Sequence, residues 1–106
     1  MLKVCKILTP NEWAIAQDQP AYSGTPLDEK DGFIHLSTPE QVPATLQRFF
    51  PDIAAVVILT INGDHLGEKL KFEENHGKSF PHLYGKLPIS AVTGIEYRRC
   101  REGWTI

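Results

Sequence analysis

Two histidines of this chain lie in segments where an imidazole could do chemistry. His35 lies in residues 32–38 (GFIHLST) and His82 in residues 80–85 (FPHLYG), each among apolar residues and close to a hydroxyl and a glycine. An imidazole can serve as a general acid, a general base or a metal ligand near neutral pH. Burying it in an apolar run is costly unless its nitrogens find hydrogen-bond partners. Two such segments in 106 residues therefore predict one polar cleft that both histidines share.

The residues around His35 follow the alternation of a β-strand. Successive side chains of a strand point to opposite faces, so Phe33, His35 and Ser37 are expected to share one face. That face would present an aromatic ring, an imidazole and a hydroxyl over about 13 Å, at about 3.3 Å per residue. Such a wall suits a ligand with a flat ring and hydroxyl groups. The alternative is a structural His35 that hydrogen-bonds to a neighbouring loop.

The second segment and a carboxylate upstream of it complete the set of candidates. Pro81 restrains the residue before it to extended conformations. If the segment is extended, His82 and Tyr84 point the same way, because they are two positions apart. A structural Tyr84, with its hydroxyl capping a backbone group, is an equally open alternative. Glu73 ends an expected strand before a turn, where a carboxylate suits catalysis but also resembles an ordinary exposed turn residue.

Other chemistries are less well supported by the spacing. His35, His82 and Glu73 could form a metal set of two imidazoles and one carboxylate, but they show none of the HxH, HxxxH or HxxE spacings. No metal is therefore expected. A histidine could activate Cys5 or Ser37 as a nucleophile, but the G-x-S-x-G pattern is absent. The chain also lacks the glycine-rich patterns that cradle phosphates.

Two short helices and a set of strands must position these side chains. Residues 9–12 (TPNE) form a capping box with proline at the first helical position, and residues 38–41 (TPEQ) repeat it with glutamine. The first helix is expected to run to about Gln17 and the second to end at Pro51. Pro43, inside the first turns of the second, either removes one backbone hydrogen bond or makes that helix start slightly late. Apolar and alternating runs predict strands at 2–8, 33–37, 54–61, 69–73 and 91–98, and loops at 20–31, 62–67 and 75–77.

This pattern predicts a single α+β domain over residues 1–106, with a mixed β-sheet and two short N-capped helices. The loop that precedes the His35 strand ends in four charged residues, which are expected to be solvated: Asp28, Glu29, Lys30 and Asp31. The chain is long enough for one hydrophobic core and too short for two domains. Nothing in the sequence indicates an oligomeric state.

Composition and charge narrow the class of protein. The chain is 42% hydrophobic and 23% charged, and its formal net charge of -2 argues against nucleic-acid binding driven by bulk charge. The nearest approach to a basic patch is Arg98, Arg99 and Arg101. No apolar run approaches the roughly 20 residues of a membrane span. Cys5 and Cys100 are expected to be reduced thiols, so a cytoplasmic location is expected.

Residues 32–42 (GFIHLSTPEQV), 48–50 (RFF) and 80–88 (FPHLYGKLP) resemble the small bacterial family called domain of unknown function 952. Residues 6–7 (KI), Trp13 and residues 70–73 (LKFE) fit the same pattern. The resemblance covers nearly the whole chain. It implies a family membership, and the name of the family states no activity.

A wider resemblance concerns the order of the elements. A strand, a capped helix, a loop and a His-Leu-Ser strand before another capped helix look like the ADP-ribosyltransferase fold, most of all its tRNA 2′-phosphotransferase branch. That resemblance implies a split sheet whose cleft holds NAD, with His35 contacting the ribose or a phosphate-bearing group and Ser37 beside it. By position, Glu73 or His82 would complete the site. The tRNA reaction itself is not expected, because Cys5 and Lys6 replace the His or Arg of the first strand and no arginine precedes His35.

The resulting hypothesis is a transferase that handles NAD or an ADP-ribosyl compound. His35, Glu73 and His82 would be its catalytic residues, and the ligand-binding side chains would be Phe33, Ser37 and Tyr84. The alternative is a non-catalytic module that binds a nucleotide or another small metabolite. A small hydrolase, a metal-dependent enzyme using the histidine pair, and a purely structural or interaction protein are the remaining alternatives.

Overall fold

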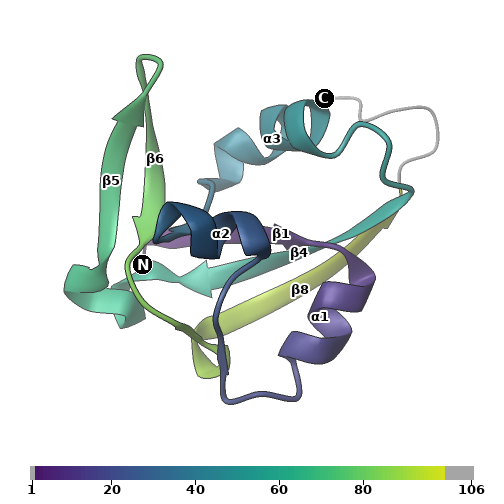
Figure 1. The fold of residues 1–106 in the computed structure, drawn as a ribbon, viewed down its shortest axis with the longest axis horizontal. Helices are drawn as coiled ribbons and strands as arrows, with labels where there is room; N and C mark the ends of the chain where they lie inside the picture. The colour runs from purple at the N-terminus through teal and green to yellow at the C-terminus, as the bar shows by residue number, and fades with distance from the viewer. Residues whose placement is uncertain (1, 100–106) are drawn as a thin grey trace.

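Three antiparallel β-sheets form the frame of the protein (Figure 1), whose computed structural model describes residues 2–99. The first sheet has the order β1 (Lys3–Leu8), β4 (Ala55–Asn62) and β8 (Val92–Arg99). The second has the order β3 (Ile34–His35), β6 (Lys78–Leu83) and β5 (Leu70–Asn75), and the third pairs β2 (Ala21–Tyr22) with β7 (Leu87–Pro88). The predicted α+β class is confirmed. The prediction of a mixed sheet is wrong for the described residues, whose strand pairs are all antiparallel.

Three short α-helices connect these strands: α1 (Pro10–Ala16), α2 (Pro26–Asp31) and α3 (Val42–Phe49). The capping box of α1 is present, since the Thr9 hydroxyl accepts from the Glu12 amide at 3.2 Å and Glu12 accepts from the Thr9 amide at 2.8 Å. The second predicted helix start instead opens a 3₁₀ turn over Pro39–Gln41, and the α-helix begins at Val42. Pro43 accounts for this delay, because it can donate no backbone hydrogen bond. Two further 3₁₀ turns cover Gly63–Lys69 and Ile89–Ala91.

Helix α2 corrects the prediction of a loop over residues 20–31. The Asp28 amide donates to the Thr25 hydroxyl at 3.2 Å, and the Thr25 amide donates to the Asp28 carboxylate at 2.9 Å. This is a capping box with aspartate in the place of the usual glutamate or glutamine. The helix ends at Gly32, which adopts the left-handed φ of 85° that glycine tolerates best. Its charged residues are therefore not all solvated, because Asp28 is only 2% exposed.

The β1-β4-β8 sheet separates two hydrophobic clusters. On β4, Val57, Leu59 and Ile61 face one cluster, and Val56 and Ile58 face the other. Strand β4 is therefore a central strand buried on both faces, which confirms the prediction of a strand over 54–61. Helix α1 contributes to the first cluster and helix α3 to the second through four buried residues: Trp13, Ala16, Val42 and Leu46.

The second sheet meets the first at one point. The Cys5 amide donates to the Ser37 carbonyl at 2.7 Å, and the Ser37 amide donates to the Cys5 carbonyl at 2.9 Å. Away from this bridge the strands part, and the β5–β6 hairpin stands apart from the first sheet (Figure 1). The predicted strand over 33–37 is thus reduced to β3 and the bridge at Ser37.

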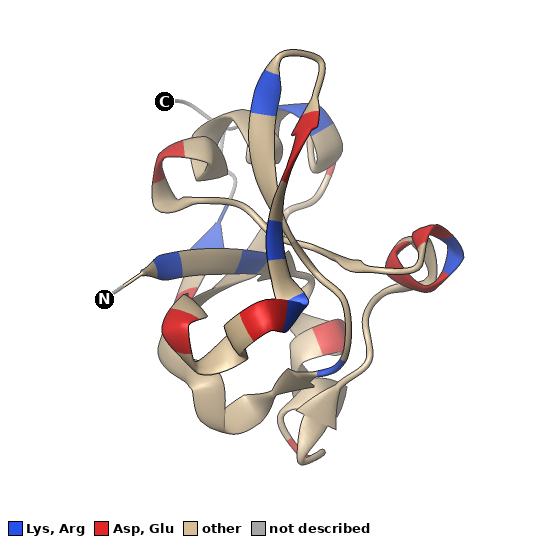
Figure 2. Cartoon of the chain, turned by 90° about the vertical axis from the view of Figure 1, so that its left-hand side faces the viewer, with Lys and Arg blue, Asp and Glu red and all other residues tan. Residues whose placement is uncertain are grey.

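Basic and acidic residues are interspersed over the chain in Figure 2. Helix α2, whose sequence is PLDEKD, projects to one side in that view. No helix within residues 2–99 is long and apolar enough to cross a membrane. Cys100 and Arg101, which entered the predictions of reduced thiols and a basic patch, lie outside the described residues.

Candidate functional site

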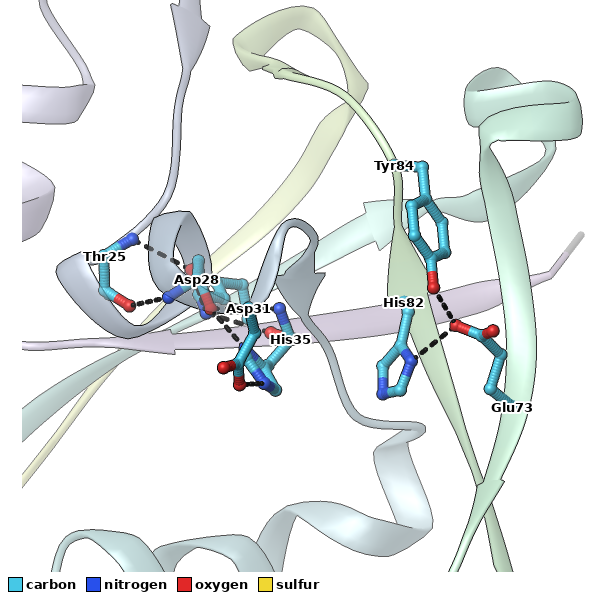
Figure 3. A network of polar contacts seen from close by, with 8 residues as sticks. Thr25, Asp28, Asp31, His35, Glu73, His82 and Tyr84 are labelled. Atoms are coloured by element: carbon cyan, nitrogen blue, oxygen red, sulfur yellow. Dashed lines mark hydrogen bonds and ion pairs between the residues drawn. The ribbon is translucent and has the colours of Figure 1, made fainter.

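His35 and His82 are opposite each other in the pairing of β3 with β6. The Leu36 amide donates to the Pro81 carbonyl at 3.1 Å, which makes the two histidines a non-hydrogen-bonded pair of the ladder. In such a pair the Cα atoms approach to about 4.5 Å and the side chains lie closest. The two ring centroids are 5.9 Å apart, with an interplanar angle of 68°. The structure therefore brings together the two histidines that the sequence predicted to share a cleft (Figure 3).

Phe33 lies against both imidazoles. Its ring stacks on that of His82 with centroids 4.0 Å apart and an angle of 20°, and it is tilted against His35 at 4.7 Å. The Tyr84 ring is tilted against the Phe33 ring, with centroids 5.4 Å apart. Four side chains from two segments, residues 33–35 and 82–84, therefore form one aromatic cluster around Phe33, a surface on which a flat ligand ring could stack.

Glu73 on β5 links His82 to Tyr84. Its Oε1 atom lies 2.8 Å from Nδ1 of His82 and accepts a 2.5 Å hydrogen bond from the Tyr84 hydroxyl. These hydrogen bonds, that from Tyr84 first, lower the pKa of Glu73, and the carboxylate in turn raises the pKa of Tyr84. An ionised carboxylate only accepts, so Nδ1 of His82 carries a proton, and in the neutral imidazole Nε2 then presents its lone pair. Nε2 has no hydrogen-bond partner among residues 2–99.

The buried carboxylate of Asp28 organises the other half of the site. Its Oδ1 atom accepts from the backbone amide of His35 at 3.1 Å and from Nδ1 of the same residue at 2.6 Å. Its Oδ2 atom accepts from Nζ of Lys6 at 2.9 Å and from the Thr25 amide at 2.9 Å. Burial alone would raise the pKa of Asp28, but the charge and hydrogen bond of Lys6, with smaller contributions from Thr25 and His35, leave the pKa lowered. Burial lowers the pKa of Lys6, and the Asp28 charge opposes that shift.

The split between the β1-β4-β8 and β3-β6-β5 sheets explains why the side chains of Asp28 and Lys6 are needed here. In a non-hydrogen-bonded pair the N–H and C=O of His35 point away from β6, toward β1. Strand β1 has already parted from this segment beyond the Cys5–Ser37 bridge, so neither group can join a ladder there. Asp28 accepts from the amide and Lys6 donates to the carbonyl at 2.9 Å. The ion pair therefore fills the gap and satisfies backbone groups that would be costly to leave unpaired.

Sequence reasoning missed both Asp28 and Asp31. The signal for Asp28 is the order Thr25-Pro26-Leu27-Asp28, which repeats the start of α1 with a shorter acidic residue. Asp31 is the last residue of α2, and its Oδ2 atom lies 3.0 Å from Nε2 of His35. Each ring nitrogen of His35 therefore faces a carboxylate, Nδ1 that of Asp28 and Nε2 that of Asp31 (Figure 3).

The structure does not bring Ser37 into this cluster. Its side chain is buried, and its Oγ lies 3.1 Å from Oγ1 of Thr45 on α3. Burial raises the pKa of the neighbouring Cys5 thiol, which disfavours the thiolate that a nucleophile requires. Within residues 2–99, no three His, Cys, Asp or Glu side chains are arranged to hold a metal ion.

A separate concavity of about 420 Å³ lies between α1 and the start of α2. Its lining includes Tyr22, Thr25 and Lys86, but not His35 or His82. The Tyr22 hydroxyl is buried without a hydrogen-bond partner in the described part of the chain, and burial raises its pKa. The concavity and the histidine cluster are therefore distinct features, and the titratable groups gather at the histidines.

Comparisons with known proteins identify relatives but no activity. A family model described as a protein of unknown function (DUF952) matches residues 7–95. The crystal structure of protein CC0527 from Caulobacter crescentus is 38% identical, with a TM-score of 0.90 over 96% of this chain and 90% of that chain. The solution NMR structure of CC0527 is 39% identical, with a TM-score of 0.83 over 96% of this chain and 89% of that chain. No curated protein matches the chain. These relatives give no support to the wider resemblance to ADP-ribosyltransferases.

Proposed function

The chain belongs to the DUF952 family of proteins of unknown function, and we propose that its histidine cluster is the site of an enzyme that transfers an ADP-ribosyl group from NAD. The observation that supports this proposal is the arrangement of His82. Glu73 holds its Nδ1 atom at 2.8 Å, its Nε2 atom has no partner among residues 2–99, and its ring lies 5.9 Å from that of His35. This is an oriented base at an aromatic surface, backed by a carboxylate.

The chemistry of the transfer matches these groups. The bond between the nicotinamide nitrogen and C1′ of the ribose breaks, and nicotinamide leaves with the bonding electrons. A hydroxyl or amine of the acceptor forms the new bond to C1′, and its proton passes to Nε2 of His82. The Glu73 carboxylate stabilises the resulting imidazolium, and fixed negative charge nearby favours the positive charge that develops on the ribose.

The remaining side chains would bind the substrate. Phe33 and Tyr84 offer ring faces for stacking, and the ring of His35, whose two nitrogens face carboxylates, would border the ribose. Asp28 would act through His35, because both its carboxylate oxygens are already bonded within the protein. Ser37 has no role in this proposal, since its hydroxyl is engaged with Thr45.

A non-catalytic binding module is the second candidate, and the state of His35 favours it. Both ring nitrogens of His35 already face carboxylates, at 2.6 Å for Asp28 and 3.0 Å for Asp31. Of the four imidazole nitrogens in the pair, Nε2 of His82 is the one without a partner in residues 2–99. A site with one open base can bind a ligand without turning it over.

Two measurements on the same protein distinguish the candidates. Imidazole and amide NMR signals are followed during titration with NAD and with ADP-ribose, and nicotinamide release from NAD is assayed in parallel. The transferase proposal expects shifts at His35, His82 and Tyr84 and release that His82→Ala abolishes. His65→Ala, at an exposed histidine in a 3₁₀ turn, is the control and should keep both signals. Binding without release supports the module, and no shift at millimolar ligand overturns both NAD-based candidates.

A further inference from the structure

Asp31 carries a carboxylate at the edge of the histidine cluster that the proposed chemistry does not use. Its side chain is 39% exposed, and its Oδ2 atom lies 3.0 Å from Nε2 of His35. Its other oxygen, Oδ1, has no hydrogen-bond partner among residues 2–99. Asp28 differs in both respects, because its side chain is 2% exposed and both its oxygens are bonded. Of the two carboxylates that face His35, Asp31 is therefore the one with an oxygen free to accept a hydrogen bond from a ligand.

The local fold holds Asp31 in place. It ends α2 directly before Gly32, whose left-handed φ of 85° turns the chain into β3, and the Gly32 amide donates to the Asp28 carbonyl at 2.9 Å. The turn places Asp31 four residues before His35, so that its Oδ2 atom lies 3.0 Å from Nε2 of that ring. The position of Asp31 is thus set by a helix end and a side-chain contact, and not by an unattached loop.

Two open acceptors consequently border the same aromatic surface. One is Oδ1 of Asp31, held beside the ring of His35, and the other is Nε2 of His82, whose ring centroid is 5.9 Å from that of His35. Figure 3 shows both imidazoles projecting to the same side of their strands, with Asp31 beside His35. A ribose bound through a hydroxyl at Oδ1 of Asp31 would leave Nε2 of His82 open to the acceptor. Carboxylates bind ribose hydroxyls in this manner in dinucleotide-binding proteins.

We propose that Oδ1 of Asp31 accepts a hydrogen bond from the vicinal diol of a ribose, which leaves Nε2 of His82 free to take the proton of the acceptor. This inference rests on the proposed function and specifies the part of the ADP-ribosyl ligand that the site recognises. The diol lies beside the end of α2, and Phe33 supports the adjoining ring. Asp31 is then a binding residue, and the protein distinguishes a ribose from an analogue without the diol.

The test compares ADP-ribose with ADP-ribose whose diols have been cleaved with periodate and reduced with borohydride. Affinities are measured by calorimetry for the wild-type chain and for Asp31→Asn and Asp31→Ala. The wild-type chain should bind the intact ligand at least about tenfold more tightly, because a hydrogen bond to a charged group is lost with the diol. Both variants should lose most of this preference while binding the cleaved ligand as well as wild type does.

The control is Glu29→Gln, which removes an exposed carboxylate from the same helix and should keep the full preference. If the wild-type chain prefers the intact ligand and the Asp31 variants retain that preference, the diol inference is overturned and the proposed function stands. If the wild-type chain binds neither ligand, both the inference and the proposed function fail. Equal binding of the two ligands by the wild-type chain overturns the inference alone.

Discussion

Asp28 binds His35 twice, at the backbone amide at 3.1 Å and at ring Nδ1 at 2.6 Å, through a single carboxylate oxygen. The backbone of β3 and the orientation of the imidazole are therefore fixed by the same buried group. Its other oxygen joins Lys6 of β1 to the start of α2. The Asp28 side chain thus connects the first sheet, helix α2 and His35 at the point where the two sheets part.

Removing this carboxylate should destabilise the fold strongly. Asp28→Ala leaves Lys6, whose side chain is 7% exposed, as a buried charge without its partner, and it also removes the cap of α2. Breaking a buried pair in this manner costs about 3–5 kcal/mol of unfolding free energy. Urea denaturation measures the loss. In Lys6→Met/Asp28→Leu the two charges are removed together, so the loss should be smaller than in Asp28→Ala, and an equal or larger loss would contradict the ion-pair account.

The same carboxylate should make stability depend on acid pH. The pKa of Asp28 is lowered in the folded state, below the unfolded value of about 3.9. Its contribution is therefore fully present above about pH 4 and is lost as the pH falls through the folded pKa. Urea midpoints at pH 6, 4 and 3 should decline in the wild-type chain, and the decline should be shallower in Asp28→Asn. Parallel declines in the two chains would assign the acid sensitivity to other carboxylates.

The Tyr84 hydroxyl should control the ionisation of Glu73. The hydrogen bond from Tyr84 is the first cause of the lowered pKa of Glu73, and that from His82 is the second. In Tyr84→Phe the pKa of Glu73 should therefore rise toward its ordinary range, because one of its two donors is gone. Carboxyl carbon NMR during a pH titration measures this shift. Tyr97→Phe, which removes an exposed hydroxyl on β8, is the matched control and should leave the Glu73 titration unchanged.

The histidine pair could be predicted from sequence because its signal is local. Apolar flanks and strand alternation place each imidazole on a strand, and the closeness of the two rings follows once the strands pair. Asp28 was not predicted because a capping box with aspartate also occurs in an acidic loop, and its burial depends on Lys6, which is 22 positions away. In the sequence, Lys6 fits the family pattern and departs from the His or Arg of the ADP-ribosyltransferase fold, but neither observation indicates a partner for it. Its partner explains it, since a buried lysine there neutralises Asp28.

The placement of Ser37 needed the tertiary structure for a different reason. Alternation alone assigns it to the face of His35, but the bridge to Cys5 and the approach of α3 decide what its hydroxyl meets. Those contacts join segments that no local pattern relates. The division of the sheets at this bridge likewise has no signature in periodicity, although it creates the gap that Asp28 and Lys6 fill.

Gly24 offers a test of how tightly Asp28 is held. Its φ is 107°, and a Cβ added there would lie 2.7 Å from Cβ of Asp28. Gly77, in the β5–β6 turn, has a φ of 80°, and a Cβ there would meet nothing within 4 Å. Both alanine substitutions carry the strain of a positive φ, about 1–2 kcal/mol, but only Gly24→Ala adds a clash with the Asp28 side chain, at its Cβ. Gly24→Ala should therefore be the more destabilising and should shift the His35 ring signals in NMR spectra, whereas Gly77→Ala should leave those signals in place. Equal effects would mean that Asp28 can move without disturbing His35.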